Sequence, residues 1–141
     1  AGNCLGLLEN LMRATQAKVA MFQLPPPIST NELFIAFNRG GKAARVKSQK
    51  YIAWRAAAGV MLEKQNPPHV AGHYGMRISV PAKTRMDLSN SIKAIEDLCV
   101  DHKVIIDDRY CENISIERGQ GDLTTVWIIS TTKKTGKNDN E

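Results

Sequence analysis

The segment RMDLSNSIKAIEDL, residues 85–98, constrains the fold more than any other part of the chain. At 100° per residue, four apolar side chains fall within one narrow arc: Leu88, Ile92, Ile95 and Cys99. Three polar side chains share a second arc: Asn90, Lys93 and Asp97. Because the apolar arc has to pack against a core, the segment predicts an amphipathic helix over residues 88–101.

The length of 141 residues allows one domain with a substantial core and is too short to predict two. We expect an N-terminal extension over 1–17 that can form a short helix, a domain over 18–130 and a polar, disordered tail over 131–141. No apolar run approaches the ~20 residues of a membrane-spanning helix, and the first residues lack the basic region of a secretory signal. Three cysteines without a close-spaced pair are typical of a reducing compartment. These features predict a cytoplasmic protein.

Short apolar runs, separated by proline and glycine, define the other elements. Five segments are predicted as strands: 17–24, 33–37, 74–81, 112–118 and 123–130. Ser48 is a good N-cap for a helix that ends at Asn66, before two prolines. Residues 38–47 are predicted as a glycine-containing loop, and the Gly119-Gln120-Gly121 spacing favours a hairpin between the last two strands. The order β-β-α-β-α-β-β predicts a single α+β domain, with a mixed sheet and both helices on one face.

Basic residues are concentrated between positions 38 and 55, where the sequence has no acidic residue. Six cations lie there: Arg39, Lys42, Arg45, Lys47, Lys50 and Arg55. Tyr51 and Trp54 are interleaved with them, and the whole chain carries a net charge of +5. Such a stretch can follow a phosphate backbone and release its counterions. It is also what a solvated loop and an exposed helix face look like, with Trp54 in the core.

Acidic residues flank the helix predicted over 88–101. Asp87 lies at its first turn, and Asp107 and Asp108 follow it where the chain turns back toward the sheet. If that turn returns to the sheet edge from which the chain left, the carboxylates converge. Oxygen ligands without His or Cys suit Mg²⁺, which beside a phosphate supports phosphodiester hydrolysis. Lys93 would then supply positive charge to a reacting oxygen.

A purely structural interpretation accounts for the same residues. Asp87 is an ideal helix N-cap, and Asp107-Asp108 is a common turn dipeptide. Lys93 and Asp97 have the spacing of an i,i+4 surface pair, which contributes only a few tenths of a kcal/mol. Spacing alone favours this interpretation.

Taken together, three stretches resemble the RusA family of Holliday junction resolvases: LPPPISTN, VKSQKYIAWR and RMDLSNSIKAIEDLCVDHKVIIDD. The resemblance covers about residues 18–130. Its most specific part is D-x-x-N-x-x-K followed by a DD pair fourteen residues after the lysine. These positions are Asp87, Asn90, Lys93, Asp107 and Asp108.

The resemblance implies a RusA-like fold and a homodimeric, Mg²⁺-dependent endodeoxyribonuclease that nicks four-way DNA junctions symmetrically in recombination and repair, with Mn²⁺ able to substitute. Such enzymes are prokaryotic and often encoded by prophages. By position, Asp87 and Asp108 would be catalytic metal ligands, Asp107 a neighbouring candidate ligand and Lys93 the catalytic cation or base-helper. Ser89 and Asn90 would have supporting roles. DNA would contact six cations: Arg39, Lys42, Arg45, Lys47, Lys50 and Arg85.

One position departs from the family pattern, in which an acid stands two residues after the first aspartate. Here that residue is Ser89, a neutral and weak Mg²⁺ ligand, so the site loses one negative charge. Two other functions therefore stay open. One is a DNA-junction-binding protein without catalysis, and the other is a basic structural or RNA-associated domain.

Overall fold

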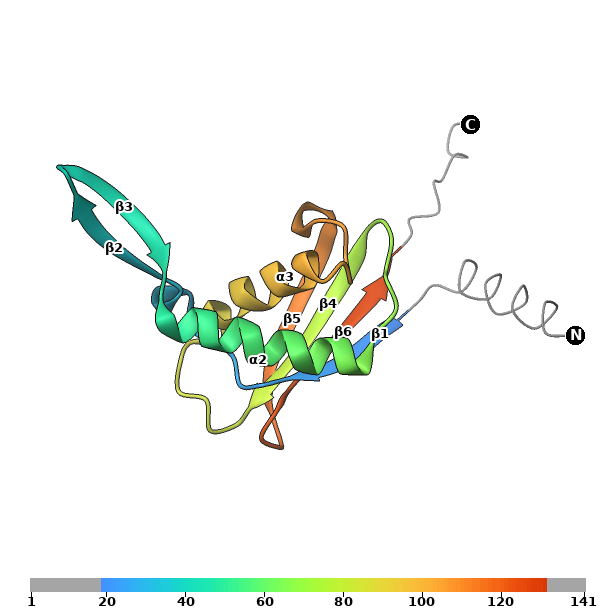
Figure 1. Cartoon of the computed structure of the whole chain (residues 1–141). Coiled ribbons are helices and arrows are strands. Elements are labelled where there is room, and N and C mark those ends of the chain that lie inside the picture. The colour runs from blue at the N-terminus through green and yellow to red at the C-terminus, as the bar shows by residue number, and fades with distance from the viewer. Residues whose placement is uncertain (1–18, 132–141) are drawn as a thin grey trace, which may run out of the picture.

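The computed structural model describes residues 19–131 and shows a four-stranded sheet, two helices and a projecting hairpin (Figure 1). The expectations for residues 1–17 and for the tail beyond residue 131 lie outside the described residues. Six strands are present: β1 (Val19–Leu24), β2 (Phe34–Arg39), β3 (Lys42–Lys47), β4 (Tyr74–Pro81), β5 (Cys111–Gly119) and β6 (Thr124–Ser130). The helices are α2 (Gln49–Gln65) and α3 (Ile92–Asp101), and three short 3-10 turns are η1 (Thr30–Glu32), η2 (Leu88–Ser91) and η3 (Asp108–Tyr110). The predicted α+β class is confirmed.

The main sheet has the strand order β1-β6-β4-β5. β6 pairs antiparallel with both β1 and β4, whereas β5 pairs parallel with β4. The predicted hairpin between β5 and β6 is therefore wrong, because β4 lies between them. Most side chains of β5 are exposed, so β5 fits the sheet edge. The mostly buried β4 and the alternately buried β6 occupy the centre. The short loop between β5 and β6 suggested a hairpin, but a short loop does not require the two strands that it joins to be neighbours in the sheet.

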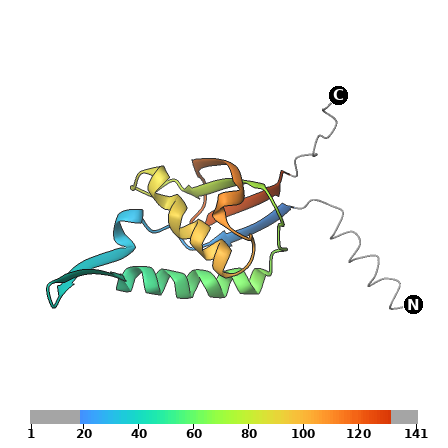
Figure 2. The same ribbon diagram turned by 90° about the horizontal axis from the view of Figure 1, so that it is seen from above.

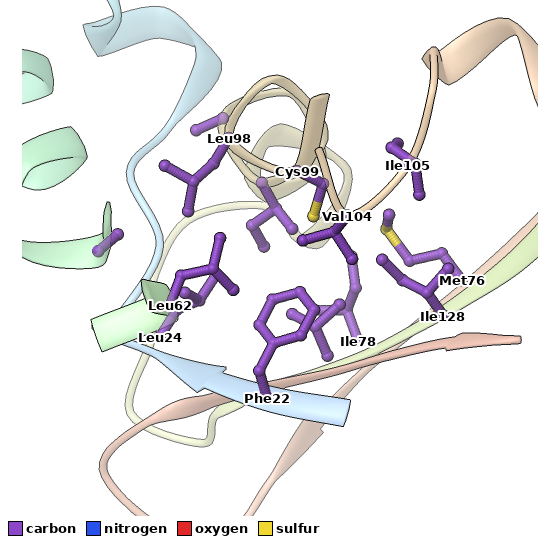
Figure 3. Close-up of a cluster of buried hydrophobic side chains, with 14 of the residues drawn as sticks. Phe22, Leu24, Leu62, Met76, Ile78, Leu98, Cys99, Val104, Ile105 and Ile128 are labelled. Atoms are coloured by element: carbon purple, nitrogen blue, oxygen red, sulfur yellow. The ribbon is translucent and has the colours of Figure 1, made fainter. Parts of the chain in front are cut away.

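The two helices cover one face of this sheet, as predicted (Figure 2). Cross-strand pairing aligns Phe22, Val126 and Ile78 on that face, and all three are fully buried. Leu62 from α2 and Leu98 from α3 reach the same cluster (Figure 3). The sheet and both helices thus share one hydrophobic core.

The helix boundaries follow local capping chemistry. The Ser48 hydroxyl accepts a 3.0 Å hydrogen bond from the Tyr51 amide, and α2 ends at Asn66 in the left-handed conformation. The second helix, predicted over 88–101, starts with the 3-10 turn η2 and becomes α-helical only from Ile92. Its apolar stripe is on the core side, where Ile95 and Cys99 are fully buried. Among the described residues, no helix is long and apolar enough to cross a membrane.

Residues 42–47 are a strand and not the loop predicted from the sequence. β2 and β3 form a separate antiparallel hairpin that projects from the domain at the start of α2 (Figure 1). Gly40 and Gly41 both have positive φ, at 61° and 81°, which a tight two-residue hairpin turn requires. The Gly-Gly pair is the sequence signal for this turn. The segment was predicted as a loop because the charged residues around the glycines are also typical of loops.

Candidate active site

A surface cleft of about 300 Å³ lies between the base of the hairpin, the first half of α2, the end of α3 and η3. Nine residues line it: Phe34, Lys47, Tyr51, Arg55, Asp97, Val100, Asp101, Asp107 and Asp108. The cations come from β3 and α2, whereas all four carboxylates come from α3 and the segment that follows it. The cleft therefore has a basic side and an acidic side.

Lys93 connects α3 to the acidic residues at η3. Its Nζ lies 3.2 Å from Asp97 Oδ1, one helical turn away, and 4.0 Å from Asp108 Oδ2. The hydrogen bond to Asp97 raises the Lys93 pKa above its ordinary value, and the charge of Asp108 adds to this effect. At neutral pH the side chain is therefore an ammonium group, suited to stabilising negative charge and unsuited to acting as a base.

Asp107 and Asp108 interact with each other, and their pKa values are shifted in opposite directions. The Asp107 carboxylate accepts a 3.0 Å hydrogen bond from the Arg109 amide, and this bond lowers its pKa. Hydrogen bonding with Asp107 is the largest cause of a raised pKa at Asp108, followed by burial, and Lys93 only partly offsets them. Of the two carboxyl groups, Asp108 therefore keeps its proton to the higher pH. A divalent cation bound by these two residues would replace that proton and offset the negative charge of both.

Glu96 is a half-buried carboxylate that sequence reasoning missed. It lies on α3 three residues after Lys93, and its pKa is raised by burial and then by the negative charge of Asp108. The i,i+3 spacing from Lys93 was the available signal, because such residues are neighbours on a helix surface. Glu96 adds a further carboxylate to the electrostatic environment of Asp108.

Asp87 occupies the N-cap position of η2, but its exposed side chain makes no capping hydrogen bond. The ion pairs of Lys93 extend to Asp97 and Asp108 and do not include Asp87. Its backbone carbonyl accepts a 3.0 Å hydrogen bond from the Asn90 amide, and the Thr30 hydroxyl donates to the Asn90 carbonyl at 2.9 Å. Ser89 is exposed on the same turn. Of the predicted catalytic residues, the structure brings together Lys93 and Asp108. Within the described residues, the Asp87 side chain forms neither an ion pair with Lys93 nor a capping hydrogen bond.

The structural interpretation of these residues is met at some positions and not at others. The Asp107 side chain caps η3, and Lys93 and Asp97 form the expected i,i+4 pair. Asp87 does not cap its helix, and Asp108 sits against Asp107 and Lys93 at the edge of the cleft. Capping therefore does not explain Asp87, whereas Asp107 and Asp108 do form the turn that the structural interpretation predicts.

The chemistry of the cleft suits a hard cation more than zinc, because its acidic side offers only carboxylate oxygens. Over residues 19–131, however, no three His, Cys, Asp or Glu side chains lie close enough together to hold a metal ion. Asp107 and Asp108 are the adjacent pair from which a site would be built. Further oxygen ligands would have to come from other side chains or from water.

The predicted DNA-binding cations occupy three locations. Lys42, Arg45 and Lys47 are exposed on β3, and Arg39 pairs with Lys42 through the backbone next to the hairpin turn. Lys50, in the first turn of α2, forms a 2.5 Å ion pair with Glu32. Arg85 is exposed in the connection before η2. Arg55 is bound to Asp101 of α3, and Trp54 is in the core, where its indole donates to the Pro26 carbonyl at 2.8 Å.

Comparison with models of known protein families finds no match, and a search of curated proteins finds no significant match.

Proposed function

We propose that the chain is a Mg²⁺-dependent, structure-selective endodeoxyribonuclease that resolves four-way DNA junctions by paired symmetric nicks. The observation that carries this proposal is the 4.0 Å approach of Lys93 Nζ to Asp108 Oδ2, from positions fifteen residues apart. The resemblance to RusA resolvases implies a site made from these two positions. Their convergence beside a basic surface supports it.

Each residue of the site would have a distinct task. Asp108 and Asp107, joined by Asp87, would hold a Mg²⁺ or Mn²⁺ ion, which when bound activates the attacking water and neutralises phosphate charge. Lys93 would stabilise the negative charge that develops on the phosphate oxygens, because its ammonium is already in place before the reaction. Lys47, on the basic side of the cleft, would hold the sugar-phosphate backbone against the carboxylates.

Two features of the proposal follow from charge and symmetry. Ser89 supplies no negative charge to the site, so we expect weaker Mg²⁺ binding and a preference for Mn²⁺. Two symmetric nicks on a two-fold junction require two sites related by a two-fold axis, which is the reason for proposing a homodimer.

Replacement of Asp87 by Asn tests this function against the second candidate. That candidate is a junction-binding protein without catalysis, favoured by Ser89 and by the lack of a three-ligand group among the described residues. If Asp87 holds the metal, Asp87→Asn lowers cleavage of a synthetic four-way junction by about 100-fold or more and leaves junction affinity within about twofold.

The matched control is Asp122→Asn, which removes an exposed carboxylate that pairs with Lys83. It should cleave as the wild type does. Junction binding without cleavage by the wild-type protein, at any Mg²⁺ or Mn²⁺ concentration, would establish the second candidate instead.

A further inference from the structure

The β2–β3 hairpin is a cationic element that projects from the domain (Figure 1). Its sequence contains four basic residues and no acidic residue. The ion pairs of the basic stretch involve the helix residues Lys50 and Arg55, not the exposed Lys42, Arg45 and Lys47 of β3. Arg45 instead lies over the Phe34 ring, 4.7 Å from its centroid, which leaves its charge available.

The strand register gives this hairpin two different faces. Phe34 pairs with Lys47 and Ala36 pairs with Arg45, which places both cations on one face. Ile35 and Val46 pair on the opposite face and are 51% and 46% exposed. The cationic face continues into the cleft, because Phe34 and Lys47 are among the residues that line it. A basic surface therefore runs from the carboxylates outward along the hairpin.

We infer that the hairpin is an arm that grips duplex DNA next to the cut site, with Lys47 and Arg45 contacting successive phosphates. Lys42 lies on the opposite face of the hairpin, together with Val46. This inference rests on the proposed function and adds to it the part of the substrate that the hairpin binds. Six residues per strand at ~3.3 Å each give an arm about 20 Å long. At 3.4 Å per base pair, it reaches about six base pairs along the DNA.

Charge favours DNA over a second copy of this chain as the partner of the hairpin. A two-fold pairing of two hairpins would bring the cations of both copies together with no acidic residue to offset them. An isolated two-stranded hairpin is also only marginally stable in water, so the hairpin is an element that binding would stabilise. A polyanion satisfies both conditions.

The test is binding of four-way junctions of increasing arm length, measured by fluorescence anisotropy in EDTA so that no strand is cut. The variant is Arg45→Gln/Lys47→Gln, which removes both cations of the cationic face, and the control is Lys64→Gln/Lys103→Gln, which loses the same charge at the end of α2 and after α3. We expect wild-type affinity to rise until the arms reach about six to eight base pairs. The hairpin variant should bind about tenfold more weakly and should lose most of the gain in affinity that longer arms give. The slope of its log K against log salt should be shallower by about 2.

The control should retain the arm-length gain and lose less than twofold in affinity. Lys47→Gln alone, which leaves Arg45 on Phe34, should show about half the change in salt slope and guards against misfolding of the double variant. A hairpin variant that matches the control in salt slope and arm-length dependence would overturn the inference. So would a variant whose only change is a shift toward monomer in sedimentation. If the wild type cuts junctions but the hairpin variant binds like the control, the inference about the hairpin fails and the proposed nuclease function holds. If the wild type does not cut junctions but the hairpin variant binds them more weakly than the control, the nuclease function fails and the inference about the hairpin holds.

Discussion

Lys93 and Asp108 are the residues on which the proposed chemistry depends most. Asp97 anchors the lysine on its own helix, so the ammonium is oriented toward Asp108 before any substrate arrives. Asp107 keeps the Asp108 pKa raised, so Asp108 loses its negative charge at a higher pH than an ordinary aspartate does. The acid limit of metal binding should therefore be set by Asp108.

Replacement of Asp107 by Asn should lower the Asp108 pKa, because hydrogen bonding with Asp107 is the largest cause of its elevation. Asp108 would then stay ionised to a lower pH. The direct measurement is the ¹³C chemical shift of the Asp108 carboxyl group, titrated in both proteins. An unchanged or higher midpoint in the variant would show that the two carboxylates do not interact as described.

At the level of elements, α3 links the core to the candidate site. One side of the helix buries Ile95, Leu98 and Cys99, while Lys93 and Asp97 project toward η3. This division could be predicted from the apolar and polar arcs of the sequence. The 3-10 start of the helix, which ends at the completely buried Ser91, was not predicted.

Replacement of Leu98 by Ala should destabilise the protein by about 2–5 kcal/mol, because the side chain is fully buried in the shared core and its loss leaves a cavity. Val60→Ala on α2 is the matched control. Val60 is 57% exposed, so its truncation should change the free energy of unfolding by no more than about 0.5 kcal/mol. Urea unfolding of both variants measures the difference. Equal effects would mean that Leu98 does not pack as described.

Across the whole molecule, the sequence predicts the elements better than their arrangement. Apolar periodicity, proline stops and Ser48 locate β1, α2 and β4 closely, because these signals are local. The place of β4 between β5 and β6 depends on which strands pair with a neighbour on both sides, and this is a property of the assembled sheet. The hairpin was missed because its Gly-Gly turn lies among charges that are equally typical of a loop.

The candidate site was predictable to a similar extent. The motif spacing gives Lys93 and Asp108, which the fold brings together. The cleft itself, which is lined by the ion pair between Arg55 of α2 and Asp101 of α3, depends on how the two helices pack beside each other. Tertiary contacts of this kind leave no local pattern in the sequence.

The most direct measurement is cleavage of a supercoiled plasmid that extrudes a cruciform, with Mg²⁺, with Mn²⁺ and with EDTA. Paired nicks in one encounter convert this plasmid to the linear form, whereas unpaired nicks give open circles. We predict linear product with either metal, more with Mn²⁺, and none in EDTA. Plasmid that stays supercoiled at every metal concentration, while the protein binds the cruciform, would contradict the claim that Asp87, Lys93 and Asp108 form a nuclease site.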